Sequence, residues 1–268
     1  MKKWISSGIG IIATVITMNS HAAIMTGPYL GIGGSWNTVD ETFDSSLFTS
    51  ATQSGEDHYN ANSSRLAPLI QAGYVAPLNA CWLWGASLQW KYLGYKTSNE
   101  NTSRGQYLPN STFSSFNIFG QNVTRDFSSQ TRLNNEFLLL VNLGMQTSNG
   151  YAYIGAGPAL LTAANSIYLS SIHTPAGTGD HLTSGSVSDN QNVWGGAVQA
   201  GYNYYLDSTI FLNINYTYLN AGKKHFNNII NAAIYNGFNA PGTAELNLNR
   251  SISFHVQELM FSINKVFC

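Results

Sequence analysis

Charged side chains are scarce in this 268-residue chain, because Asp, Glu, Lys and Arg together make up 9% of it, against about 25% in an ordinary soluble domain. Long apolar runs are also missing from the mature chain, which excludes a helical membrane protein because each helical span needs about 20 apolar residues. The net charge of −1 provides no basic surface, so no nucleic-acid partner is expected. The 13% of aromatic residues exclude a disordered chain.

The first 22 residues have the three-part composition of a secretory signal peptide. Lys2 and Lys3 form a basic start, and residues 4–18 form an apolar stretch that is too short to span a membrane. Ser20 and Ala22 are small residues at the positions that such residues occupy just before the cleavage site of a signal peptide. We therefore expect residues 1–22 to be removed on export and residues 23–268 to form the mature domain.

The mature chain contains alternating apolar and polar residues, a pattern that places successive side chains on opposite faces of a strand. It is clearest in residues 81–96, where Trp84 lies on the apolar face and Lys91 on the polar one. In the last segment the apolar phase shifts above Glu258, which predicts a β-bulge near Gln257. Eight segments show the alternation: 28–39, 65–76, 81–96, 131–147, 151–169, 193–206, 209–220 and 251–267.

The connections between these segments alternate in length. Three are short turns rich in Pro, Asn, Gly or Asp, and four are long and polar. An even number of strands, with short turns at one rim and long loops at the other, is typical of bacterial transmembrane barrels. We therefore predict an all-β fold, an eight-stranded antiparallel transmembrane up-and-down β-barrel with short periplasmic turns and four long extracellular loops. The predicted turns are residues 77–80, 148–150 and 207–208, and the predicted loops are residues 40–64, 97–130, 170–191 and 221–250.

The apolar faces distinguish this barrel from a soluble sandwich or a lipocalin-type barrel. A soluble barrel has its apolar face inside and abundant charge outside. Here Trp and Tyr lie near both ends of the strands with aliphatic residues between them, as in an outer-membrane barrel. We expect an aromatic girdle facing lipid at the two membrane interfaces: Trp36, Trp82, Trp84, Trp90, Tyr92, Trp194, Tyr202, Tyr204, Tyr216 and Tyr218.

Four charged residues fall on the polar faces of the strands and are expected inside the barrel: Lys91, Arg132, Glu136 and Glu258. Charges in a narrow, poorly hydrated interior need partners. One hypothesis is an electrostatic gate that passes small ions when the ion pairs rearrange. We favour the other, a satisfied ion-pair network that plugs the interior, because eight strands leave room only for side chains.

A hydrolase would need a nucleophile and a base side by side. Ser253 and His255 share one face of the last segment, with Glu258 three residues further on. Residues on the same face of a strand are about 6–7 Å apart, so we expect a polar strand rim and no catalytic residue. The glycine runs precede no helix and the acidic residues lack the spacing of an EF-hand, so we expect no cofactor and no metal ion.

The chain has only two cysteines, Cys81 and Cys268, and both are expected at the short-turn rim. In the proposed strand order they lie three strand spacings apart, an arc of about 14 Å. A disulfide needs Cα atoms within about 7 Å of each other. We therefore predict no disulfide between them.

Four stretches of the mature chain carry a family resemblance: GPYLGIGGSW (27–36), Gln71-Ala72-Gly73-Tyr74, YAYIGAGPAL (151–160) and the closing strand 259–267. In these stretches the chain resembles the small eight-stranded outer-membrane barrels of the OmpA-like β-barrel family. The resemblance implies a barrel in the cell outer membrane. Barrels of that family usually end in an aromatic residue that the assembly machinery recognises. The resemblance therefore implies a C-terminal assembly signal made of Phe261, Ile263 and Phe267, which Cys268 follows here.

These observations predict a surface-exposed structural or interaction protein, adhesin-like, that acts through its long loops. The expected partners are outer-membrane lipid and lipopolysaccharide, the barrel-assembly machinery and an extracellular protein ligand. A small-solute or ion pore is the alternative function. A lipid A-modifying hydrolase is a second alternative.

Overall fold

The computed structural model describes residues 25–49, 54–101, 116–118, 121–173, 185–236 and 240–267. The predicted signal peptide and Cys268 lie outside these residues, so the predicted cleavage and the predicted lack of a disulfide stay predictions. Cys81 has a free, exposed thiol. Among the described residues no helix is long and apolar enough to cross a membrane.

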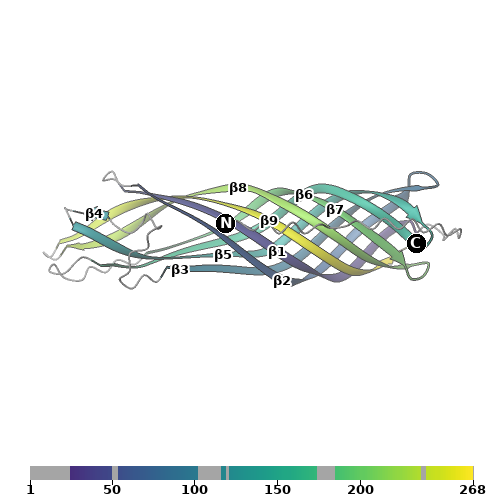
Figure 1. Ribbon diagram of the computed structural model, residues 1–268, viewed down its shortest axis with the longest axis horizontal. Helices are drawn as coiled ribbons and strands as arrows, with labels where there is room; N and C mark the ends of the chain where they lie inside the picture. Colours follow the sequence, from purple (N-terminus) through teal and green to yellow (C-terminus); the bar gives the residue numbers. More distant parts are fainter. Residues whose placement is uncertain are drawn as a thin grey trace, which may run out of the picture.

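Eight long strands form a closed antiparallel barrel, which confirms the predicted fold class (Figure 1). Their spatial order is β3-β2-β1-β9-β8-β7-β6-β5, and pairing of β3 with β5 closes the barrel. A ninth, short strand, β4 (Phe116–Ile118), pairs with β5. The long strands are β1 (Gly27–Thr49), β2 (Ser54–Pro77), β3 (Trp82–Asn101), β5 (Gln121–Thr147), β6 (Gly150–His173), β7 (Gly185–Tyr205), β8 (Ile210–Asn236) and β9 (Ala240–Val266).

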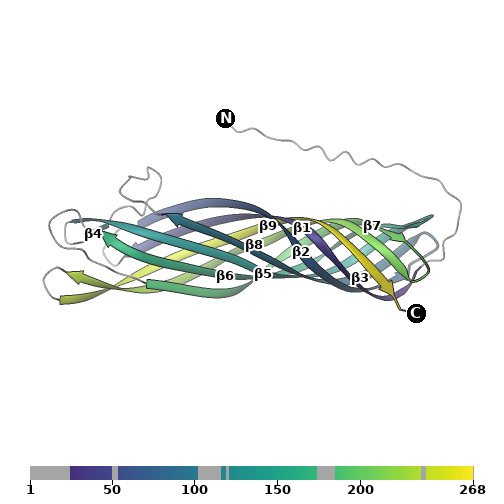
Figure 2. The ribbon, with the colours of Figure 1, turned by 90° about the horizontal axis from the view of Figure 1, so that it is seen from below.

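One end of the barrel, which we call the turn end, carries the three short turns at their predicted positions. In the β2–β3 turn the Asn79 side-chain oxygen accepts hydrogen bonds of 2.9 Å from the backbone N–H groups of Cys81 and Trp82. In the β7–β8 turn the Asp207 carboxylate accepts bonds of 2.6 and 2.8 Å from the N–H groups of Thr209 and Ile210. Side-chain acceptors of this kind are why Asn and Asp favour tight turns. The last residues of β9 lie at the same end (Figure 2).

At the opposite end the strands are much longer than predicted. The ranges 40–64, 97–130, 170–191 and 221–250 were expected to be loops, and their described parts are almost entirely strand. The prediction was wrong because these segments are rich in Asn, Ser and Thr, which hide their alternation. Their backbone groups are paired nonetheless, as in the continuous register from Gly27↔Val75 to Phe48↔Ser54 between β1 and β2.

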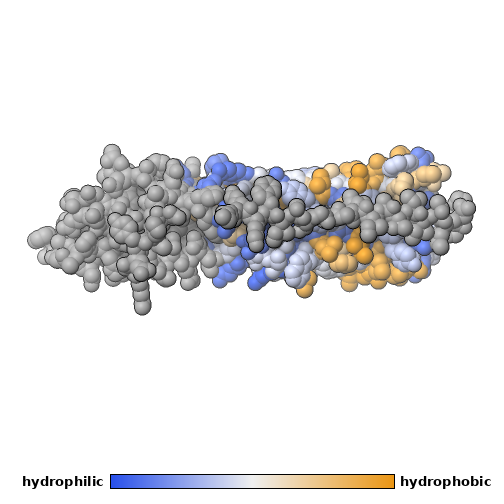
Figure 3. Space-filling model, viewed as in Figure 1, coloured by the Kyte–Doolittle hydropathy of each residue, from blue (hydrophilic) through white to orange (hydrophobic). Residues whose placement is uncertain are grey.

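The outside of the barrel changes character along its axis (Figure 3). Near the turn end the exterior is a band of large apolar side chains, among them Ile32, Leu88, Val141 and Ile154. We call this part the membrane section. Beyond it lies a part that we call the extension, where the outward side chains that the structure describes are mostly polar, among them Asp40, Ser64 and Asn220. The extension comprises residues 38–49, 54–64, 94–101, 121–133, 162–173, 185–192, 220–236 and 240–257.

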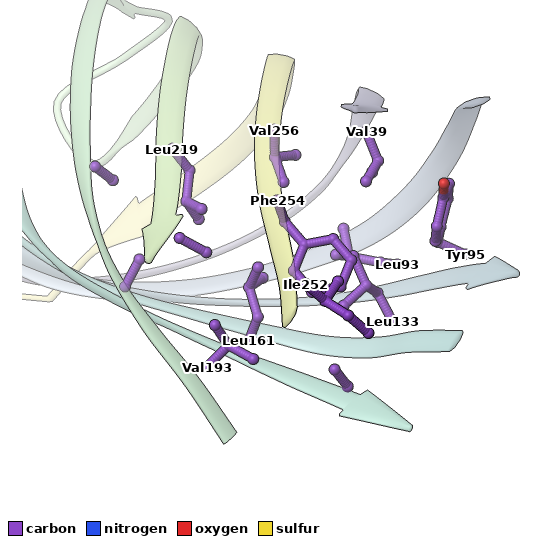
Figure 4. Close-up of a cluster of buried hydrophobic side chains, with 14 of the residues drawn as sticks. Val39, Leu93, Tyr95, Leu133, Leu161, Val193, Leu219, Ile252, Phe254 and Val256 are labelled. Carbon is purple, nitrogen blue, oxygen red and sulfur yellow. The ribbon is translucent and has the colours of Figure 1, made fainter. Parts of the chain in front are cut away.

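The inside changes in the opposite sense. In the membrane section, buried Asn, Gln, Ser and Thr side chains share the interior with apolar ones such as Leu83 and Leu140. One apolar cluster spans the boundary between the two parts, from Leu161 and Leu219 in the membrane section to Leu133, Phe254 and Val256 in the extension (Figure 4). The described buried side chains of the extension are mostly apolar. Along the same strands, the exterior therefore loses its apolar band where the described interior becomes mostly apolar.

The barrel wall opens where the extension begins. Strand β2 pairs with β3 only through residues 69–77 and 83–91, and β7 pairs with β8 only through residues 195–205 and 211–221. Beyond these points the extension consists of two four-stranded sheets, β2-β1-β9-β8 and β3-β5-β6-β7, with the apolar cluster between them.

Bulges accompany this separation. Gly94, just past the last β2–β3 pair, adopts the left-handed φ of 54°, and β8 shifts register between Ala221 and Lys224. An extra residue in one strand bends and twists it away from its neighbour. The bulge predicted near Gln257 is not there, because β9 keeps an unbroken register with β1. The apolar phase above Glu258 reflects the change to an apolar interior.

Candidate functional site

Toward the turn end, the interior of the barrel contains a hydrogen-bonded network of amide and hydroxyl side chains. Gln71 donates to the Ser262 hydroxyl at 2.8 Å, and Gln199 donates to the Thr217 hydroxyl at 3.1 Å. Asn213 donates to the Tyr153 hydroxyl at 2.7 Å. Buried polar groups must be paired in this way, and a satisfied network makes the interior rigid.

Three charged residues lie above this network, and we call them the ion triad: Lys91, Glu136 and Glu258. Their side chains are 0% exposed. Lys91 Nζ donates to Glu136 Oε1 at 2.6 Å and to Glu258 Oε2. Lys91 and Glu136 are paired Cα positions on β3 and β5, whereas Glu258 reaches them from β9 across the interior. The triad therefore connects opposite walls of the barrel. The sequence predicted these three residues on the inner face, but not the contact of Glu258 with Lys91 across the interior.

The triad has one ammonium group for two carboxyl groups. Glu136 Oε2 and Glu258 Oε1 have no hydrogen-bond partner within the described part of the chain. Burying charge costs free energy that only close pairing and hydrogen bonding offset. Lys91 is therefore the residue on which the arrangement depends, since each carboxylate has it as its ion-pair partner.

Arg132 does not join the triad, and this part of the predicted network is wrong. Its side chain is exposed on the outside, where Nε donates to Gln130 Oε1 at 2.8 Å. The cause is a bulge in β5 between Leu133 and Asn135, which inserts one residue opposite β6. Odd-numbered residues point inward before the bulge and even-numbered ones after it, so Arg132 and Glu136 lie on opposite faces.

The interior leaves little free space. A cavity of about 20 Å³ lies within the polar network, beside Tyr29, Gln89 and Asn213. That volume holds about one water molecule. Further from the turn end, the ion triad and the apolar cluster lie side by side in the interior. This arrangement corresponds to the plug hypothesis.

The ten aromatic girdle residues all have outward-facing positions on their strands. Four of them lie near the turn end: Trp82, Trp84, Tyr202 and Tyr204. The other six lie further along the strands, and one of these, Trp194, is 65% exposed. Aliphatic residues separate the two groups. This is the distribution by which aromatic side chains mark the two interfaces of a bilayer. Phe261, Ile263 and Phe267 are also exposed on the outside, and their role as an assembly signal stays a prediction.

Ser253 and His255 do not form a catalytic arrangement with Glu258. His255 lies on the outside of β9, where its ring stacks on that of Tyr218 with centroids 6.5 Å apart, and its Nδ1 lies 3.4 Å from the Tyr218 hydroxyl. Glu258 is inside the barrel, in the ion triad. Among the described residues there is also no cluster of three or more potential metal ligands.

Sequence reasoning missed one buried carboxyl group. Glu41 is 1% exposed inside the extension, where it accepts hydrogen bonds from Thr97 at 2.7 Å and Tyr95 at 3.4 Å. Burial raises the pKa of the Glu41 carboxyl, and these bonds only partly oppose the shift. The signal that could have identified it is its phase, because Glu41 lies between the inward-facing Val39 and Phe43.

No family model matches the chain, and no curated protein matches it either. Among solved structures it is similar to Ail, the attachment invasion locus protein of Yersinia pestis, with 9% identity, a TM-score of 0.33 and coverage of 88% of this chain and 99% of that one. It is similar to the outer membrane protein OprG from Pseudomonas aeruginosa, with 13% identity, a TM-score of 0.38 and coverage of 90% and 96%. It is also similar to Neisserial surface protein A (NspA), with 13% identity, a TM-score of 0.31 and coverage of 87% of this chain and 97% of that one. At these TM-scores the fold rests on the strand pairing itself.

Proposed function

We propose that the protein is an outer-membrane β-barrel that acts as a surface-exposed structural and interaction protein, adhesin-like, through its extension. The observation that carries the proposal is that the strands continue past the apolar band and still enclose buried apolar side chains, such as Phe43, Phe226 and Phe254. Paired strands with buried apolar side chains can project into water as a folded structure and hold contact residues in place, as a rigid scaffold does for binding residues. In this proposal the contact surface is formed by extended strands, whereas the sequence predicted long loops.

The orientation follows from the short turns. Outer-membrane barrels have short turns on the periplasmic side and their longer segments outside the cell. The apolar band between two groups of aromatic residues supports membrane insertion. With the turn end in the periplasm, the extension projects from the cell surface, where it can contact another cell or an extracellular protein.

The filled interior disfavours the alternative of a pore. The polar network, the ion triad and the apolar cluster all lie in the described interior. We propose that the barrel carries no solute and catalyses no reaction. Planar-bilayer recordings test the first part, because the account expects no stable conductance, and stable conductance abolished by Lys91→Met would favour the pore instead.

A shortened extension tests the interaction role. Replacing residues 40–62 with Asn-Gly would join β1 to β2 at the pair Val39↔Ser63, with most of the barrel unchanged. We expect bacteria that display this variant to lose attachment to surfaces coated with extracellular-matrix proteins or host cells. The control carries a short polar insertion after Ser208 at the turn end. Heat-modifiable gel mobility shows that both barrels are folded, and attachment equal to that of the wild type would contradict the proposal.

A further inference from the structure

We propose that Lys96, Arg132 and Arg65 form a binding site for the phosphate group of a lipid headgroup, on the outside of β2, β3 and β5 where the extension leaves the membrane section. The inference rests on the proposed position of the barrel in the outer membrane. It concerns the lipid partner and is independent of what the extension contacts.

The first observation is a pair of like charges in direct opposition. Lys96 and Arg132 are paired Cα positions on β3 and β5, and both side chains are exposed on the outside. Like charges directly opposite each other destabilise a sheet. An anion between them removes this repulsion. The Arg132 bond to Gln130 uses Nε, so the two Nη groups can contact a phosphate in the two-pronged manner that guanidinium groups favour.

The second observation is the position of Arg65. By alternation it belongs to the inward face of β2, opposite the buried Asn37. Because β2 and β3 have separated at this level, its exposed side chain donates from Nη1 to the carbonyl oxygen of Gly94 on β3. A Cβ atom built on Gly94 would lie 3.5 Å from Arg65 Nη1 and 3.2 Å from the Tyr92 ring. Arg65 therefore adds a third cation beside Tyr92, two residues from Lys96.

The third observation is that no described acidic side chain of β2, β3, β5 or β6 shares the outer face with these cations. The Glu41 carboxylate of β1, which accepts from Tyr95 and Thr97, is buried inside the barrel. Among residues 60–77, 82–97, 130–147 and 150–166, which cover β2, β3, β5 and β6, the only acidic residue is Glu136, and it points inward. Elsewhere on the extension the exposed Lys223 has an ion pair with Asp44 at 2.8 Å. The three cations of the proposed site have no such partner among these residues.

The level of the site identifies its ligand. Lys96 is the first outward charge on β3 after the girdle residues Trp90 and Tyr92, and Arg132 is the first on β5 after Phe137. Aromatic side chains of this kind lie at the membrane interface, so the next residues along the strands are at the level of the headgroups. Basic residues there attract anionic lipid. The chemistry fits a phosphate monoester or diester, from a phosphorylated glycolipid or from free phosphate.

The experiment compares four proteins refolded in detergent micelles, with binding followed by native mass spectrometry. The ligands are bisphosphorylated lipid A, the same lipid without its phosphates, and inorganic phosphate. Lys96→Gln/Arg132→Gln should raise the Kd for the phosphorylated lipid at least tenfold, since it removes two charge-assisted contacts. The matched control Lys223→Gln/Lys265→Gln also removes two exposed cations and should leave the Kd within twofold. Arg65→Gln should give an intermediate loss.

The arms separate the possible results. A lipid headgroup is supported if the double variant loses affinity only for the phosphorylated lipid and if 10 mM inorganic phosphate does not displace that lipid from the wild type. Full competition by phosphate alone overturns the lipid as the source. Equal Kd values for wild type and Lys96→Gln/Arg132→Gln, or an equal loss in the control, overturn the site. Heat-modifiable gel mobility verifies folding. If the double variant does not fold, each single variant is expected to raise the Kd for the phosphorylated lipid about threefold. An unchanged Kd in both single variants then overturns the site. Attachment is unaffected in every case, which separates this test from that of the proposed function.

Discussion

The membrane section and the extension are built from the same strands, yet their polarities are opposite. In the first, Ile32 and Val141 face outward while Asn213 and Gln71 face inward. In the second, Phe43 and Phe254 face inward while Lys96 and Asn220 face outward. Alternation places side chains on two faces, but the medium outside the wall decides which face is apolar. The ion triad lies close to the boundary between the two sections, beside the apolar cluster.

The ion triad gives the largest expected effect. Lys91→Met leaves two buried carboxyl groups without their ammonium partner, and we expect it to reduce the free energy of unfolding by about 3–5 kcal/mol. Urea unfolding of the refolded barrel in lipid vesicles measures this change. The triple variant Lys91→Met/Glu136→Gln/Glu258→Gln, which removes all the charge, should recover most of the loss. A loss below about 1 kcal/mol in the single variant would show that the triad contributes little.

The apolar core of the extension gives the next largest effect. Phe254→Ala should cost about 3–5 kcal/mol, because it leaves a cavity in the closed cluster. The matched variant Phe261→Ala lies on the lipid-facing side of the same strand, where lipid can fill the space, and should cost much less. Limited proteolysis should also cut the extension of Phe254→Ala first. Equal costs at the two positions would mean that the extension has no packed core.

Glu41 provides a pH-dependent difference inside the extension. Its pKa is raised by burial in the folded state, so the folded protein binds that proton more tightly than the unfolded chain does. Its contribution to stability is therefore greatest below the unfolded pKa of about 4.3 and is lost as the pH rises through the folded value. We expect Glu41→Gln to be more stable than the wild type at pH 7 and equal to it near pH 3, by urea unfolding. A constant difference across this range would contradict the buried, raised carboxyl.

The smallest effect is expected at the turn end. Backbone hydrogen bonds from Thr209 and Ile210 lower the pKa of the exposed Asp207 carboxyl. The stability that it contributes is present at neutral pH and is lost as the pH falls through its lowered folded pKa. Asp207→Asn should therefore show a slight loss at pH 7 that disappears at low pH. A larger loss than that of Phe254→Ala would reverse the ranking of the two regions.

The sequence predicted well what alternation and turn chemistry determine. Lys91 and Gln89 lie inside, Trp84 lies outside, and Asn79 and Asp207 hold tight turns. The misplaced residues have one cause each. Arg132 was misplaced because one bulged residue reverses the phase of β5, and a bulge has no compositional signal. The long strands were missed because their sequences are as rich in Asn, Ser and Thr as those of loops. Phe254 and Val256 were mistaken for a shifted lipid face because an apolar interior was not expected in a membrane barrel.

Lipid contact at single sites tests the inversion most directly. Spin labels can be placed on single cysteines at Leu88 and Val141 in the membrane section and at Ser64 and Asn220 in the extension, with Cys81 and Cys268 replaced by Ser. We predict that, in vesicles, dissolved oxygen relaxes the first two labels and a water-soluble nickel chelate relaxes the second two. Oxygen dominance at Ser64 and Asn220 would place the whole barrel in lipid and contradict a projecting extension.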